Sequence, residues 1–179
     1  MSVVDLQPWL DRARELGADD ATLIDPQKVV TAEWVRLKCE FGCDGFGECR
    51  TCPPHSPTPA TTRRVLDEFR RVILMRVGPS TDQADSDRLH EGLRKTATDL
   101  ERELFLAGFH KAWSIPCGPC EECDPCNLEG ACLHPERSRP SMEACGIDVF
   151  STVRNAGWEI EVVRDRTSPY RFFALVLVD

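Results

Sequence analysis

Cysteines are the residues best placed to do chemistry in this sequence, because nine of the ten fall in two short blocks. Clustered thiols could form disulfides, bind zinc or bind an iron–sulfur cluster, and each of these needs a different spacing. The first block, CEFGCDGFGECRTC, contains Cys39, Cys43, Cys49 and Cys52, and the second, CGPCEECDPCNLEGAC, contains Cys117, Cys120, Cys123, Cys126 and Cys132.

The second block contains an unbroken C-x2-C-x2-C run formed by Cys120, Cys123 and Cys126. This run resembles the ferredoxin pattern that ligates a four-iron cluster, whereas zinc sites usually pair two knuckles from separate chain segments. Cys132 could supply the fourth thiolate ligand after this run. Cys117, which precedes the run, offers an alternative set of ligands that begins one cysteine earlier. The spacing therefore predicts a [4Fe-4S] cluster here, with zinc as the alternative.

The first block has C-x3-C and C-x2-C pairs around a glycine-rich loop, so its four thiols form a closed ligand set. The pair formed by Cys49 and Cys52 makes zinc a stronger rival than in the second block. We nevertheless predict a second four-iron cluster at this block, which gives two [4Fe-4S] clusters in the chain.

Composition excludes several other classes of protein. The chain has 22 basic and 30 acidic residues, a formal charge of -8, which opposes binding to nucleic acid. The first twenty residues contain no apolar run of signal-peptide or membrane-span length, so we expect a cytoplasmic protein without a membrane partner. Because thiols stay reduced in the cytoplasm, structural disulfides are a poor explanation for these cysteines.

Two stretches of the sequence resemble one known family. They are VRLKCEFGCDGFGECRTCPPHSPTPATTRRVLDEF and GPCEECDPCNLEGACLHPERSRPSMEACGIDVFSTVRNAG. Both are similar to the prokaryotic proteins grouped as domain of unknown function family 2284, predicted metal-binding proteins. The resemblance implies metal ligands at Cys39, Cys43 and Cys52 and at Cys120, Cys123, Cys126 and Cys132.

Cys49 stands where other members of that family often carry another residue. If Cys49 is not a ligand, the first site has three thiolates and one iron that is open to substrate. His55, in CPPHSP, could then be a fourth ligand or a proton donor, although an exposed loop histidine is the simpler interpretation.

The elements that must position these blocks alternate between helices and strands, which predicts an α/β or α+β fold. We expect a single layered metal-binding domain over residues 1–179, with a central sheet of about four or five strands, packed helices and cysteine-rich loops at 39–57 and 117–140. Periodicity leaves residues 31–39 undecided. It predicts helices over 6–17, 58–72, 84–108 and 141–157 and strands over 21–24, 72–77, 110–116, 159–165 and 171–179.

Three functions remain open on the sequence alone. The leading hypothesis is a two-cluster protein that passes electrons to or within a partner enzyme. The second is an enzyme that uses an open iron at the first block to activate a small-molecule substrate, and the third is a zinc-stabilised adaptor. His134, Arg137 and Arg139 could assist a cluster or an anion, but a surface role in a solvated loop is the simpler interpretation. Cys145 is expected to be a buried thiol.

Overall fold

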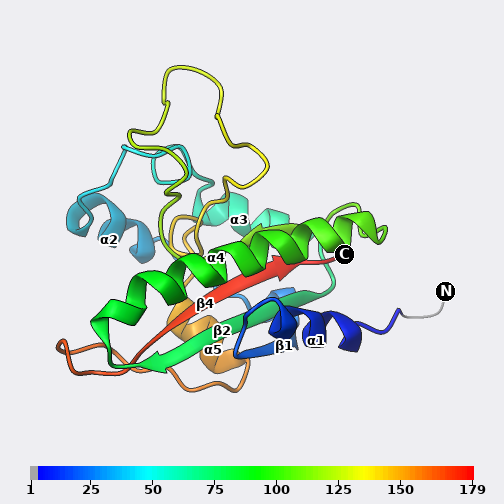
Figure 1. Cartoon of the computed structure of the whole chain (residues 1–179). Coiled ribbons are helices and arrows are strands. Elements are labelled where there is room, and N and C mark those ends of the chain that lie inside the picture. The colour runs from blue at the N-terminus through cyan, green and yellow to red at the C-terminus, as the bar shows by residue number, and fades with distance from the viewer. Residues whose placement is uncertain (1–3) are drawn as a thin grey trace.

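Four strands form one antiparallel sheet in the computed structural model, which describes residues 4–179 apart from the side chain of Gln83. The strands lie in the order β1, β2, β4, β3 (Figure 1). Their bounds are Asp20–Ile24 for β1, Val72–Ser80 for β2, Trp113–Ile115 for β3 and Tyr170–Leu177 for β4. Together with the helices, this sheet gives an α+β domain, which confirms the expected fold class.

The two central strands, β2 and β4, are apolar on both faces because both faces of the sheet are covered. Leu74 pairs with Leu175 and Met75 pairs with Ala174 in the antiparallel register, and all four are fully buried. A strand that is buried on both sides reads as a continuous hydrophobic run instead of an alternating one. This explains the runs VILM and FALVLV in the sequence.

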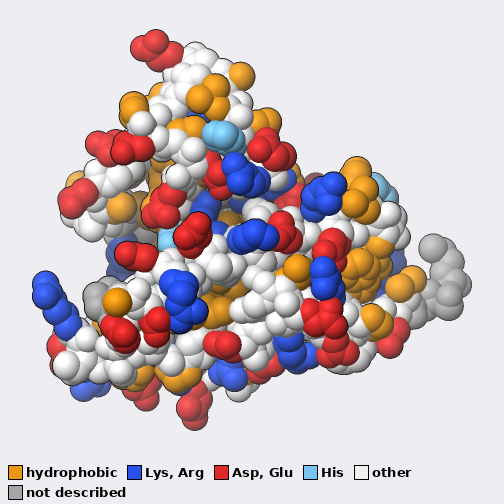
Figure 2. All heavy atoms as spheres, viewed as in Figure 1, with side chains coloured by type: hydrophobic (Ala, Val, Ile, Leu, Met, Phe, Trp, Pro, Cys, Tyr) orange, Lys and Arg blue, Asp and Glu red, His pale blue; other side chains and the backbone are white. Residues whose placement is uncertain are grey.

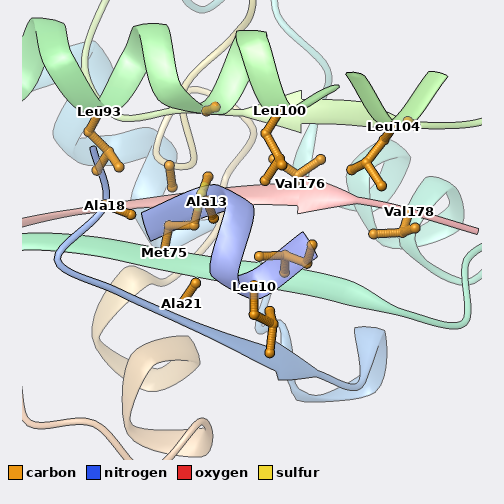
Figure 3. Packing of buried hydrophobic residues seen from close by; sticks show 14 of the residues in the cluster. Leu10, Ala13, Ala18, Ala21, Met75, Leu93, Leu100, Leu104, Val176 and Val178 are labelled. Atoms are coloured by element: carbon orange, nitrogen blue, oxygen red, sulfur yellow. The ribbon is translucent and has the colours of Figure 1, made fainter. Parts of the chain in front are cut away.

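Helix α4 (Gln83–Leu106) runs along one face of the sheet, with α1 (Gln7–Glu15) beside it (Figure 1). The apolar positions of α4 recur every three or four residues, so they form one stripe that faces the strands. Figure 3 shows Leu93, Leu100 and Leu104 of this stripe packed over the side chains of Met75 and Val176.

The opposite face is covered by α3 (Pro59–Leu66), the short 3-10 helix η1 (Pro26–Lys28) and α5 (Val149–Asn155). Thr58 caps α3 by accepting a hydrogen bond from the amide of Thr61, which confirms the expected start of this helix. Leu66 and Val153 pack there against Leu74 and Leu175. Helix α2 (Trp34–Gly42), in the region that periodicity left undecided, projects beside the cysteine loops (Figure 1).

Several expected elements are shorter than predicted or are not formed. Residues 159–165 form a loop, because Val162 and Val163 point into solvent and no strand pairs with this segment among the described residues. The expected helix over 141–157 begins only at Val149. Residues 142–146 form turns because Gly146 has φ +72°, and a Cβ there would lie 2.3 Å from Cγ of Pro59. Ile147 forms an isolated β-bridge with Thr31.

Other helices and strands are formed as expected but begin or end at residues other than those predicted. The helix expected over 58–72 ends at Leu66, and the strand expected over 110–116 is confined to Trp113–Ile115. None of the helices in the described part of the chain combines the length and the apolar character needed to cross a bilayer.

Candidate metal centre

The two cysteine loops lie side by side at one end of the molecule (Figure 1). The first joins α2 to α3, and the second joins β3 to α5. Arg50 of the first loop connects them, because its Nε donates to the carbonyl of Asn127 at 2.7 Å and its Nη2 donates to the carbonyl of Leu128 at 3.0 Å. The guanidinium also donates to the carbonyl of Gly130. One side chain thus fixes the backbone of the second loop against the first.

Three cysteines of the first block, one in α2 and two in the loop after it, gather around one recess. Cys39, Cys43 and Cys52 line a cavity of about 410 Å³, together with Phe46 and Pro53. Loss of hydration is the main cause that raises the pKa of Cys52 to about 11, and neighbouring thiols add to it. A bound metal would reverse this preference, because metal ligation deprotonates a thiol.

Three cysteines of the second loop border a neighbouring recess of about 540 Å³, which Cys120, Cys123 and Cys126 line. Cys132 does not line this recess, but its charge is among the causes that raise the pKa of Cys123, after loss of hydration and the charges of Cys126 and Cys120. Cys132 therefore lies near the same group. Cys52 borders both recesses, so the two thiol groups are neighbours.

Cys49 lies beside the second loop and beside Cys52, but it does not line the recess of Cys39 and Cys43. It lines the larger recess beside Cys120 and Cys126 and does not line the smaller one. Its Sγ lies 3.2 Å from Oγ1 of Thr51 and 3.7 Å from the carbonyl oxygen of Cys120. Burial opposes its ionisation, but hydrogen bonds from Thr51 and from Cys126 outweigh this effect and lower the pKa of Cys49.

The two remaining cysteines are deeply buried. Cys117 is 5% exposed and forms part of the wall of the first recess, where its Sγ donates to the carbonyl of His90 at 3.8 Å. Cys145 borders neither thiol-lined recess. Burial raises the pKa of each of these thiols to about 12, which keeps both protonated in the absence of a metal.

The wall opposite the first thiol group contains His90 from α4 and Glu143 from the turns before α5. Nε2 of His90 lies 3.2 Å from the carbonyl oxygen of Cys117, and its ring packs on Phe172 with centroids 5.4 Å apart. Glu143 is exposed, but the protein atoms around its carboxyl reduce its hydration, and this raises the pKa of the carboxyl. Sequence reasoning missed both residues because neither has a ligand at a regular spacing.

The remaining candidates have other environments. His55 is exposed and borders neither thiol-lined recess, and His134 lies 3.9 Å from Glu136 at the surface. Arg137 is exposed and pairs with Glu122 at 2.9 Å, as expected for a solvated loop. Arg139 is different, because it is buried.

Arg139 anchors the end of the second loop to the domain. Its Nε and Nη2 donate to the two carboxylate oxygens of Glu101 at 2.9 and 2.6 Å, and its guanidinium stacks on the ring of Trp113 at 4.1 Å. The same Glu101 carboxylate accepts the backbone amide of Ser114 in β3. Arg139 therefore has a structural role.

The donor set fits a metal of the soft class. Within residues 4–179, no three His, Cys, Asp or Glu side chains are arranged to hold a single metal ion. The fit rests on chemistry: thiolates select iron–sulfur clusters, zinc or copper(I), and each thiol group here borders a recess of several hundred Å³.

Comparison with known proteins gives one match. Residues 22–178 match the model of the family described as "Predicted metal-binding protein (DUF2284)". No curated protein and no solved structure matches the chain.

Proposed function

The chain belongs to the DUF2284 family of predicted metal-binding proteins, and on this premise we propose that it is a cytoplasmic iron–sulfur enzyme with two [4Fe-4S] clusters. Cys39, Cys43 and Cys52 would hold the first cluster. The second would be held by the cysteines of the second loop that the family pattern assigns, namely Cys120, Cys123, Cys126 and Cys132.

One observation carries this proposal. Cys39, Cys43 and Cys52 face a recess of about 410 Å³, whereas Cys49, the fourth thiol of their block, lies with the second loop. Three protein thiolates leave one iron of a cubane without a cysteine. When bound, such a cluster supplies one-electron transfer and a Lewis-acidic iron.

The other walls of the recess give it the character of a substrate site. Phe46 and Phe172 supply apolar surface, and Glu143 and His90 are the ionisable groups besides the thiols. Because the pKa of Glu143 is raised, its carboxyl holds a proton more readily than an ordinary glutamate and could deliver it to a bound molecule. His90 is held by Cys117 and Phe172, so it orients a polar group instead of swinging free.

A second candidate function, electron transfer to a partner enzyme, is favoured by the surface of α2. Trp34, Leu37 and Phe41 are exposed at 45, 56 and 79% and recur along one side of this helix, which also contains Cys39. Orange and red side chains gather over this end of the molecule in Figure 2. An apolar surface with acidic neighbours fits a docking site for a redox protein with a basic rim.

The deciding experiment measures iron, acid-labile sulfide and zinc per chain in protein purified without oxygen, together with the electron paramagnetic resonance spectrum of the reduced sample. About eight irons with equal sulfide are expected from two cubanes. A small ligand that coordinates iron, such as cyanide, should change the spectrum of one cluster only. Cys52→Ser should abolish that change.

Two other results would each favour a different function. Eight irons with no spectral response to cyanide would favour the electron carrier. Stoichiometric zinc in a colourless protein would support the adaptor, in which thiolates only organise the loops.

A further inference from the structure

Arg171, at the start of β4, is a half-buried cation that lines a cavity and has no partner among the described residues. Its Nε is buried and has no hydrogen-bond partner, and its guanidinium forms no ion pair or hydrogen bond with any residue that the structure describes. A buried donor of this kind carries a desolvation cost that a ligand would relieve. Arg171 lines a recess of about 290 Å³, and among the described residues that line this recess it is the only cation.

The recess at Arg171 adjoins the recess of the first thiol group. Cys117, Glu143 and Phe172 line both cavities, so these three residues form the common wall. The two recesses therefore lie next to each other along these residues, and together they are called the cleft.

The shape of the sheet explains why the cleft lies there. Strand β3 pairs only with residues Leu175 to Leu177 of β4, and the chain then turns away into the second cysteine loop. The first part of β4, which contains Arg171 and Phe172, consequently has no strand on that edge. The space that a longer β3 would fill is bordered instead by α5 and by the loop after it, through Phe150, Ile160 and Val163.

The lining of the cleft defines the chemistry of a ligand. The walls near Arg171 are mostly apolar, and include Val149, Phe150, Ile160, Pro169 and Phe173. Glu143 and Glu161 line the same recess, but neither forms an ion pair with Arg171 in the described part of the chain. A guanidinium presents a planar fork of donors that matches a carboxylate.

We propose that this cleft binds a small organic acid, with its carboxylate on Arg171 and its apolar body directed toward the first thiol group. This proposal names the substrate class of the enzyme proposed above. Only the statement that the bound acid reacts rests on that proposed function. The binding step itself requires no assumption about the metal. A carboxylate at Arg171 would leave the far end of a short apolar molecule beside Glu143 and His90.

The test is calorimetric titration of the full chain, as purified without oxygen, with benzoate and hexanoate and with the neutral amides benzamide and hexanamide. At least one acid should bind saturably, and its amide should bind at least tenfold more weakly. Arg171→Gln should weaken acid binding at least tenfold, because it removes charge-assisted hydrogen bonds. Arg171→Lys keeps the positive charge but loses the planar fork of donors, so its affinity for the acid should lie between those of the wild type and Arg171→Gln.

Arg166→Gln is the matched control, since Arg166 is exposed in the loop before β4 and does not line the recess. It should bind the acid as the wild type does. Circular dichroism and metal content of each variant establish that the fold and the thiol sites are intact.

Three results would overturn the proposal: equal acid affinity in wild type and in a folded Arg171→Gln variant, equal affinity for acid and amide, or no saturable binding of either acid. These results are independent of the metal. If the protein contains zinc in place of iron, the redox function is refuted, but the comparison of wild type with Arg171→Gln still shows whether the cleft binds an acid. If the protein contains iron–sulfur clusters but Arg171→Gln binds the acid as well as the wild type does, the proposed function stands and the organic acid is refuted as its substrate class.

Discussion

The Sγ of Cys49 lies 3.7 Å from the backbone carbonyl oxygen of Cys120, although 70 residues separate the two in the chain. This contact joins the two cysteine loops at their thiol-bearing segments. Arg50, the next residue, donates to carbonyls of the same second loop, so Cys49 and Arg50 both face that loop. This arrangement supports the proposal that the first centre has three cysteine ligands.

Replacement of Cys49 and of Cys132 should have different effects on metal content. Cys132→Ser should lower the iron content by about four per chain, the content of one cubane, because it removes a ligand of the second cluster. Cys49→Ser should keep both clusters and shift the spectrum of the second, whose surroundings lose a thiol hydrogen bond. The reverse pattern, measured by iron and sulfide analysis, would assign Cys49 as the ligand in place of Cys132.

Cys123 and Cys145 provide a second comparison of ligand and non-ligand. Cys123→Ser should remove the second cluster, since Cys123 lies between two other thiols of the recess. Cys145→Ser should leave the metal content unchanged, because Cys145 is 2% exposed and packs in the core between the sheet and α3. Equal metal loss in both variants would contradict the ligand assignment.

The ion pair between Arg139 and Glu101 should contribute strongly to stability. The two side chains are only 9 and 11% exposed, so Arg139→Ala leaves a buried carboxylate without its partner and should cost about 3–5 kcal/mol. Arg137→Ala is the control, because the Arg137 side chain is 55% exposed and its pair with Glu122 should contribute less than about 1 kcal/mol. Urea unfolding measures both, and similar losses would refute the anchoring role.

Gly118 should tolerate no side chain while His90 is present. A Cβ at Gly118 would lie 1.8 Å from Nε2 of His90, and the backbone has φ +60°. Gly118→Ala should therefore lower stability by more than Gly157→Ala, where φ is +82° and no atom lies within 4 Å of the added Cβ.

The backbone strain alone should cost about 1–3 kcal/mol at either glycine. Adding His90→Ala to Gly118→Ala should bring its loss close to that of Gly157→Ala, as a double-mutant cycle would show. An unchanged loss in the double variant would mean that the contact with His90 is not the cause.

The pair of Arg12 and Glu103, which connects α1 to α4, should make stability depend on pH. Nε and Nη2 of Arg12 donate to the two carboxylate oxygens of Glu103 at 2.8 Å each, and this hydrogen bonding lowers the Glu103 pKa from its usual 4.5. A lowered pKa in the folded state adds stability above pH 4.5 that is lost as the pH falls through the lowered value.

The melting temperature of Glu103→Gln should therefore lie below that of the wild type at pH 7, and the gap should close as the pH falls below 4.5 and through the lowered pKa of Glu103. Asp87→Asn is the control, because Asp87 is exposed on the same helix and forms no ion pair with the described residues. A gap that persists at low pH would indicate that the Gln variant loses packing instead of charge.

Local sequence determined the features that depend on near neighbours in the chain. The stripe of leucines from Leu89 to Leu104 predicted α4, and the run of apolar residues after Arg71 predicted β2, because helical and buried-strand periodicity are visible in single segments. The cysteine spacing likewise identified the two thiol blocks, and the resemblance of the sequence around them pointed to the metal-binding family.

Tertiary structure decided which thiols share a site and what surrounds them. The grouping of Cys49 with Cys120, the placement of His90 and Glu143 around the first recess, and that of Arg171 in the adjoining recess depend on contacts between segments that are far apart in the chain. The strand expected over 159–165 is not formed for the same reason. A strand requires a hydrogen-bonding neighbour, and only the assembled sheet can supply one. Spacing along the chain thus predicted the kind of ligand, whereas packing between distant segments determined the composition of each site.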